Sequence, residues 1–217
     1  MQASTRHHFI GWSIGEILAA YQAKTLSPID VAHICIARQR NCEPHHLAWE
    51  VFDEQVLLRY AERMKARLDS HQPLRLLEGI PVGIKDIFNT IEFPTQMGSP
   101  IWQGFTPGND ARAVYHVLRQ GGMLAGKTVT AEFAVHALGK TRNPHDATLN
   151  PGTSSSGSAA AVASGVLPLA LGTQTAGSIV RPASYCGVYG CKPSFGLIPR
   201  TGMLKTTDSL DSVGFFV

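Results

Sequence analysis

The sequence predicts an α/β fold in which a β-sheet is sandwiched between helices. Stretches with apolar residues at helical spacing alternate along the chain with short apolar runs that are bounded by glycine and proline. The composition, 44% hydrophobic and 16% charged, is ordinary for a folded protein with a core of its own. Such an alternation of helix and strand is typical of α/β architectures, and 217 residues is near the upper range for one domain.

Residues 1–75 are predicted to form a helical segment that packs on the core. Ser27-Pro28-Ile29-Asp30 has the features of a helix start, with a capping serine, a proline in the first turn and an acid after it. A second helix is predicted over 53–68. Its apolar residues recur at helical spacing: Val56, Leu57, Tyr60, Ala61, Met64 and Leu68.

Residues 76–217 are predicted to form an α/β core that belongs to the same domain. The run from Leu77 to Asp86 is predicted to contain a buried strand. Asp110 is expected to cap the next helix, which Gly121-Gly122 would terminate, and 123–126 is the following strand.

Two loops rich in small polar residues then follow, at 143–157 and 172–178. A helix over 158–164 and a strand over 166–171 are predicted between them. Each loop exposes backbone N–H groups that regular structure would otherwise satisfy, and loops held by a rigid scaffold are where binding and catalysis concentrate. The apolar run 211–217 predicts that the chain stops partway through a larger domain, so that the fold is incomplete at its C-terminus.

Several classes of function lack support in the sequence. The formal charge is only +3, and the densest basic stretch, 59–75, also contains acids, so we expect a solvated helix face rather than a nucleic-acid surface. No metal-ligand spacing or phosphate-binding glycine motif occurs, and no apolar run has membrane-spanning length. The four cysteines suit neither a disulfide framework nor a zinc site. We therefore expect no cofactor, no metal, no membrane association and a reducing cytoplasm.

A lysine and two serine-bearing loops point to chemistry. Lys85 lies at the end of the predicted strand in the run Gly79-Ile80-Pro81-Val82-Gly83-Ile84-Lys85-Asp86. A serine loop follows at Ser154-Ser155-Ser156, and Ser178 is the last residue of the second loop. With the runs 152–163 and 172–179, the sequence resembles the amidase signature family, and the resemblance covers nearly the whole chain. It implies a mixed central sheet, a catalytic role for residues 76–217, a Ser-Ser-Lys triad and no cofactor.

The resemblance also implies a role for individual residues. Ser178 resembles the acylated nucleophile, Ser154 the bridging serine and Lys85 the base behind it. The backbone N–H groups of the turn that ends at Ser178 occupy the place of the family's oxyanion hole: Thr175, Ala176, Gly177 and Ser178 itself. Ser155 is left as either a supporting hydrogen-bonding residue or an ordinary loop serine.

Elementary chemistry agrees with these roles. A serine hydroxyl is a weak nucleophile until a neighbouring base removes its proton. Lysine can act as that base only when it is neutral, which requires burial or nearby positive charge to lower its pKa from about 10.4. Lys85 follows an apolar strand, so we expect it to be desolvated.

The chain departs from the family pattern in two places. Thr153 and Ser156 replace glycines beside Ser154, where the family has a cis peptide bond before the bridging serine. Near the nucleophile, Gln174 stands where the family usually has an acid and Val180 where it usually has an arginine. Because replacing both members of a buried pair can be nearly neutral, we predict that Gln174 and Val180 lie near each other.

The resulting functional prediction is the hydrolysis of a small carboxamide, or a related acyl C–N bond, through an acyl-enzyme. Two alternatives stay open: the A subunit of a glutamyl-tRNA amidotransferase, and a truncated fragment without activity. The predicted partner is a small-molecule amide, with no direct contact to nucleic acid, and a homodimer is also left open.

Overall fold

The computed structural model describes residues 8–135 and 137–217, which form one mixed six-stranded sheet in the order β1-β3-β2-β4-β6-β5. The strands are β1 (Trp49–Phe52), β2 (Pro81–Lys85), β3 (Met123–Thr128), β4 (Leu169–Gln174), β5 (Gly190–Cys191) and β6 (Ser212–Phe216). The helices are α1 (Ile14–Gln22), α2 (Pro28–His46), α3 (Glu54–Asp69), α4 (Arg112–Arg119), α5 (Ser156–Ala163) and α6 (Val180–Cys186), with short 3-10 helices at Pro100–Trp102 and Glu132–Ala134.

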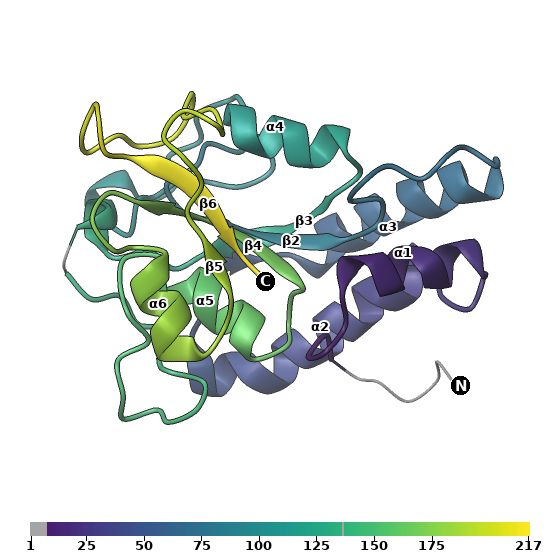
Figure 1. Cartoon of the computed structure of the whole chain (residues 1–217), viewed down its shortest axis with the longest axis horizontal. Coiled ribbons are helices and arrows are strands. Elements are labelled where there is room, and N and C mark those ends of the chain that lie inside the picture. The colour runs from purple at the N-terminus through teal and green to yellow at the C-terminus, as the bar shows by residue number, and fades with distance from the viewer. Residues whose placement is uncertain (1–7, 136) are drawn as a thin grey trace.

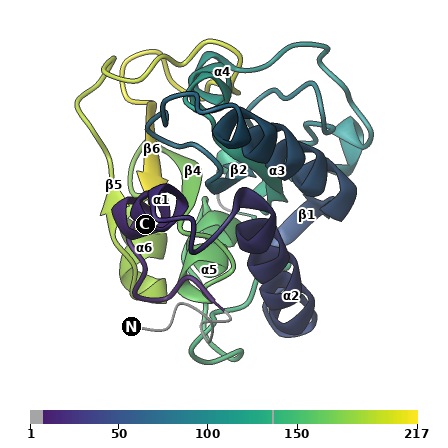
Figure 2. The same cartoon turned by 90° about the vertical axis from the view of Figure 1, so that its right-hand side faces the viewer.

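Helices lie on both faces of this sheet, as the sequence predicts. In Figure 1, α4 lies above the sheet, whereas α5 and α6 lie below it. Figure 2 shows the same layers from the side, with α2 and α3 together at the end of the sheet that carries β1. The central strands β3, β2 and β4 run parallel to one another, and the outer strands β1 and β6 are antiparallel to their neighbours. None of the described helices is long and apolar enough to cross a membrane.

The helix starts that the sequence predicts are mostly confirmed, because caps are local. The Ser27 side chain accepts from the backbone N–H of Asp30, and the Asp30 carboxylate accepts from the N–H of Ser27. Asp53 caps α3 by accepting from two N–H groups of its first turn. The prediction that Asp110 caps α4 is wrong. Its carboxylate accepts from the N–H of Ile91 instead, and α4 starts after Ala111 without a side-chain cap.

Two strands differ from the prediction. Strand β1, which lies within the segment predicted to be helical, pairs with β3 and forms one edge of the sheet. The sequence predicts a strand over 166–171, but β4 runs over Leu169–Gln174, because its pairing with β6 continues as far as Gln174. Thr173 and Gln174 are therefore parts of the sheet rather than of the loop that follows it.

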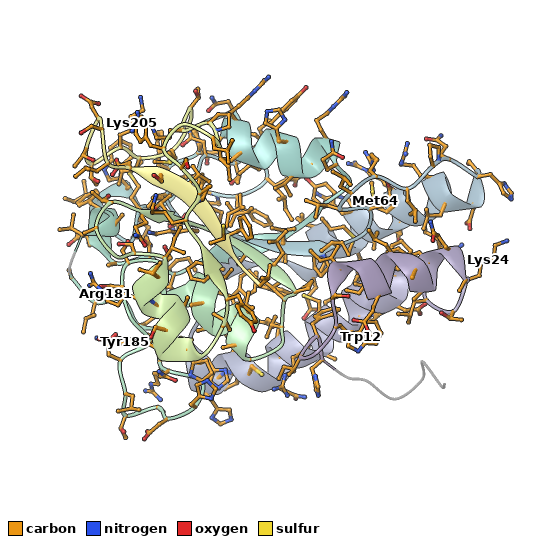
Figure 3. The ribbon with its side chains drawn as sticks, in the orientation of Figure 1. Trp12, Lys24, Met64, Arg181, Tyr185 and Lys205 are labelled. Atoms are coloured by element: carbon orange, nitrogen blue, oxygen red, sulfur yellow. The ribbon has the colours of Figure 1, made fainter. Side chains whose placement is uncertain are left out.

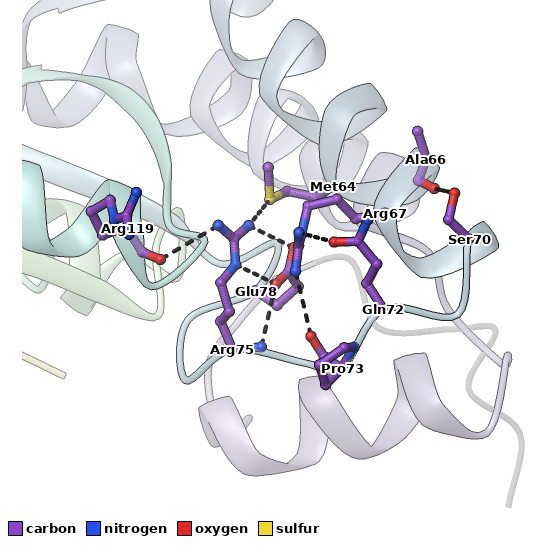
Figure 4. Close-up of polar contacts among 9 residues, drawn as sticks. All are labelled: Met64, Ala66, Arg67, Ser70, Gln72, Pro73, Arg75, Glu78 and Arg119. Carbon is purple, nitrogen blue, oxygen red and sulfur yellow. Dashed lines mark hydrogen bonds and ion pairs between the residues drawn. The ribbon is translucent and has the colours of Figure 1, made fainter.

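A buried carboxylate holds the segment that leads into β2. Glu78 is fully buried, and its two carboxylate oxygens accept from the guanidinium of Arg75 while Arg67 of α3 forms a second ion pair with it (Figure 4). Burial alone would raise the pKa of Glu78, but the hydrogen bonds and charge of Arg75 outweigh it and leave that pKa below the usual value. This network joins α3 to the start of β2 and so helps to place Lys85 at the other end of the strand.

Candidate active site

The predicted site residues come from one end of the sheet. Lys85 is the last residue of β2, and β4 runs parallel beside it and ends at Gln174, just before the turn that contains Ser178. Ser154 lies immediately before α5, which packs against β2, β3 and β4 from below (Figure 1). Because the carboxyl ends of parallel strands meet at one edge, the fold brings these three distant segments together.

Lys85 contacts Ser154 directly. The Lys85 Nζ atom donates hydrogen bonds to Ser154 Oγ at 2.7 Å and to Thr173 Oγ1 at 2.9 Å. The lysine is 0% exposed and Ser154 is 1% exposed. Burial lowers the pKa of Lys85 from 10.5 to about 7, although the negative charge of Asp211 raises it somewhat. A substantial fraction of this lysine is therefore neutral at physiological pH, as a base must be.

The serine loop before α5 is buried and tightly packed against the sheet. The Thr153–Ser154 peptide bond is cis, as the resemblance implies. Ser155 Oγ donates to the carbonyl oxygen of Thr173 at 3.2 Å and accepts from its N–H at 3.3 Å, which ties the loop to β4. A side chain at Gly172 would come within 3.0 Å of Ser155 Oγ, so the glycine allows this close approach.

The turn that carries Ser178 leaves its backbone N–H groups open. Within the described residues, the N–H groups of Thr175, Ala176, Gly177 and Ser178 donate no hydrogen bond. Gln174 holds the end of the turn, because its Oε1 atom accepts from the N–H groups of Ile179 and Val180 at 2.9 and 3.0 Å. The predicted proximity of Gln174 and Val180 is therefore confirmed, through a contact between a side chain and the backbone.

The Ser178 side chain is half-buried and is not hydrogen-bonded to Ser154. In the part of the chain that the structure covers, its hydroxyl makes no hydrogen bond, so the structure joins Lys85 to Ser154 but not Ser154 to Ser178. Catalytic hydrogen bonds are often long or misaligned before substrate binds.

Sequence reasoning missed two residues of the site. Thr173 is the second acceptor for Lys85. The Asp211 carboxylate accepts from the hydroxyl of Thr175 and from the N–H groups and hydroxyls of Thr206 and Thr207. These donors hold the pKa of Asp211 below its usual value in spite of its burial, so the group remains a fixed negative charge beside the site. No local pattern in the sequence marks either Thr173 or Asp211, because β4 is buried along its whole length and shows no alternation.

In residues 8–135 and 137–217, no cluster of three or more histidine, cysteine, aspartate or glutamate side chains could hold an ion. The site offers a buried amine whose pKa is lowered to about 7, the hydroxyls of Ser154 and Ser178, and a row of open backbone donors.

Comparisons with known proteins agree on one family. The family model described as Amidase matches residues 30–217. The A subunit of the glutamyl-tRNA(Gln) amidotransferase from Chloroflexus aggregans is 38% identical over 216 residues, covering 97% of this chain and 44% of that protein.

The chain also resembles solved structures of a peptide amidase and of an amidotransferase A subunit. The native peptide amidase from Stenotrophomonas maltophilia superimposes with a TM-score of 0.92 at 30% identity, covering 98% of this chain and 46% of that one. The A subunit of the glutamyl-tRNA(Gln) amidotransferase from Thermotoga maritima has a TM-score of 0.80 at 32% identity, covering 96% and 44%. The chain thus spans less than half the length of the relatives it matches.

Proposed function

Because the chain belongs to the amidase signature family, we propose that it hydrolyses carboxamides, or related acyl C–N bonds, through an acyl-enzyme on Ser178. The observation that carries the proposal is the contact of a fully buried lysine amine with a buried serine hydroxyl, at 2.7 Å from Lys85 Nζ to Ser154 Oγ. Lysine is almost never fully buried unless it is paired with an acid, and a lysine that burial makes neutral is a base.

The reaction follows from these groups. Ser178 Oγ attacks the amide carbon while its proton passes to Ser154, whose own proton moves to the neutral Lys85 amine. Return of a proton along the same path to the amide nitrogen allows the C–N bond to break and releases ammonia or an amine. A water molecule then attacks the acyl-enzyme in the same way, which releases the carboxylic acid and restores Ser178.

The turn at 175–178 is proposed to supply the oxyanion hole. Its backbone N–H groups have no partner within the described chain, so they are available to the negative oxygen that develops during attack. Asp211 fixes the Thr175 side chain at the start of this turn. Removing one such donor typically costs roughly 3–4 kcal/mol of transition-state stabilisation.

The test is the intact mass of the protein after incubation with a panel of amides and hydroxylamine. An acyl adduct, or its hydroxamate product, is expected with the wild-type chain and not with Ser178→Ala. Thermal unfolding of the variant serves as the control for folding. An adduct that persists in Ser178→Ala would place the nucleophile elsewhere, and no adduct with any amide or with a fluorophosphonate probe would contradict the proposed activity.

A second candidate is supported by the relatives themselves. Several proteins at 37–39% identity are named as the A subunit of a glutamyl-tRNA(Gln) amidotransferase, and in that case the same site would release ammonia from glutamine for a partner protein. Release of ammonia from glutamine only when the other amidotransferase subunits are added would favour this candidate over a free-standing amidase.

We also propose a small-molecule amide as partner and a reducing cytoplasmic location. The location is supported by the cysteines: Cys35, Cys42, Cys186 and Cys191 are all free thiols. Fractionation of cells followed by titration of the thiols would test it, since a disulfide in the isolated protein would contradict a reducing compartment.

A further inference from the structure

A small cavity lies between the loop 138–151 and the start of α5. Its volume is about 250 Å³, below the roughly 300–1,000 Å³ of pockets that hold drug-sized ligands. The loop is anchored to α6, because Asn143 Nδ2 donates to the carbonyl oxygen of Tyr185 at 2.9 Å. Figure 3 shows Tyr185 and Arg181 on the outer side of α6, at the edge of the molecule. The cavity therefore has one wall from this loop and another from the serine loop.

Both residues that depart from the family pattern beside Ser154 line this cavity. They are Thr153, which is 8% exposed, and Ser156, which is 3% exposed. Ser156 is the first residue of α5, and side chains on a helix lean toward its N-terminus, which directs Ser156 back toward Thr153. Within the described residues, the buried Ser156 Oγ atom has no hydrogen-bond partner. Because an unpaired buried hydroxyl is destabilising, this one indicates a partner that enters the cavity.

Other polar groups of the cavity are free to donate. Thr153 Oγ1 accepts from Arg181 Nη1 at 3.4 Å, and its own O–H donates to no group in the part of the chain that the structure describes. Asn150 Oδ1 accepts from the N–H of Gly152 at 2.6 Å, which leaves the Nδ2 group available. The backbone N–H of Ser156 donates to no group of residues 8–135 and 137–217 either. The cavity thus offers donors from two hydroxyls, an amide and a helix start.

A positive charge accompanies these donors, and no acid opposes it. Arg142 lines the cavity, and its guanidinium neither pairs with a carboxylate nor donates a hydrogen bond to any described residue. No aspartate or glutamate is among the described residues that line the cavity. Asp146 belongs to the same loop but is held by the N–H and the hydroxyl of Thr148. Donors that surround a cavity together with an unpaired guanidinium match an anion.

We propose that this cavity binds a small oxyanion, a carboxylate or a phosphate, through Arg142, the hydroxyls of Thr153 and Ser156, and the first N–H group of α5. The planar fork of arginine matches two oxygens of either group, and the start of a helix favours negative charge. The size of the cavity restricts the ligand to a few heavy atoms. The inference goes beyond the proposed amide hydrolysis and does not depend on it.

The test is calorimetric titration of the whole chain with inorganic phosphate and, separately, with acetate, at an ionic strength held constant with chloride. The variants are Arg142→Met, which keeps length without charge, Ser156→Ala, which removes the hydroxyl, and Ser156→Gly, which gives the residue that the family usually has. Arg119→Met, at the exposed end of α4, is the matched control for loss of one positive charge. Thermal unfolding without added anion checks that each variant is folded.

We expect at least one of the two ions to bind the wild type with saturation, and the ion that binds more tightly identifies the oxyanion. Arg142→Met should weaken binding by about tenfold or more, because a charged hydrogen-bond donor is lost. Each Ser156 variant should weaken it by about threefold to tenfold, because one hydroxyl contact is lost, and Arg119→Met should leave it within about twofold.

Two results would overturn the inference. One is the absence of saturable binding of either ion to the wild type. The other is an affinity that stays unchanged in Arg142→Met, or in both Ser156 variants, since an anion held by the open N–H groups at 175–178 would bind these variants equally well. Neither result bears on the proposed hydrolysis, because no amide enters the measurement.

Discussion

Replacing Lys85 by methionine tests whether this lysine is neutral in the folded protein. Methionine has a similar length and no charge, and it suits a position that is 0% exposed. The folded-state pKa of Lys85 is about 7, against 10.5 ordinarily, because of burial. Between these two values the unfolded chain binds a proton at this position that the folded chain does not, so the contribution of Lys85 to stability rises as the pH rises.

The size of the effect follows from the pKa. At about 1.4 kcal/mol for each pKa unit, burial of this amine costs about 5 kcal/mol below pH 7 and progressively less up to pH 10.5. Between pH 7 and pH 9.5, the wild type should therefore gain about 3 kcal/mol of unfolding free energy relative to Lys85→Met. The hydrogen bonds that methionine loses, to Ser154 and Thr173, add a penalty that depends little on pH.

The assay is urea unfolding at half-unit steps of pH, followed by tryptophan fluorescence and far-UV circular dichroism. Each curve gives an unfolding free energy by linear extrapolation, and equal slopes in the two proteins show that the same surface is exposed. Lys205→Met removes an exposed lysine and should show no such dependence on pH. A difference between wild type and Lys85→Met that stays constant from pH 7 to 9.5 would mean that Lys85 is charged in the fold, and the base assignment would be refuted.

Three further predictions follow from the same geometry. The kcat/KM for amides should rise about tenfold per pH unit below pH 7 and level off above it, because only neutral Lys85 accepts a proton; a flat pH–rate profile would contradict this. Asp211→Asn removes the charge that raises the pKa of Lys85, so the midpoint of that profile should move to lower pH, whereas a shift to higher pH would count against the electrostatic role. Glu78→Gln should cost about 3 kcal/mol at neutral pH by stranding Arg75. The loss should fade as the pH drops from the usual carboxyl pKa through the lower folded-state pKa of Glu78, because the unfolded wild type then gains a proton that the folded one does not; urea unfolding at pH 7 and pH 3.5 would detect the difference.

The parts of the fold that the sequence predicts are those fixed by neighbours along the chain. Ser27 and Asp53 are helix caps because their acceptors and donors lie within three residues. Asp110 looks equally suitable, but the N–H of Ile91, brought close by the tertiary fold, takes its carboxylate. Strand β1 escapes prediction for a similar reason, since its four residues lie between two helices and only their pairing with β3 makes them a strand.

The candidate site also contains residues that local motifs mark and residues that only the tertiary fold brings together. Lys85, Ser154 and Ser178 are marked by motifs of several residues each, and the structure joins the first two directly. Sequence reasoning places Thr173 in a loop, because the end of β4 depends on its pairing with β6 rather than on its own residues. Asp211 accepts a hydrogen bond from Thr175, which lies 36 residues away in the chain, and no local pattern in either segment predicts this contact.

The sequence around Ser178 lacks both charged residues that the family usually has at positions 174 and 180, and an arginine stands at position 181. Gln174 provides, without charge, an oxygen that accepts two N–H groups at the start of α6, and Val180 is 50% exposed, so no charge is left stranded at either position. A guanidinium is found instead one residue further along, and one residue on a helix turns a side chain by about 100°. That rotation takes Arg181 away from Gln174 and toward Thr153 and Gly177. A cation at position 181 therefore contacts the segments next to the two serines instead of pairing with residue 174.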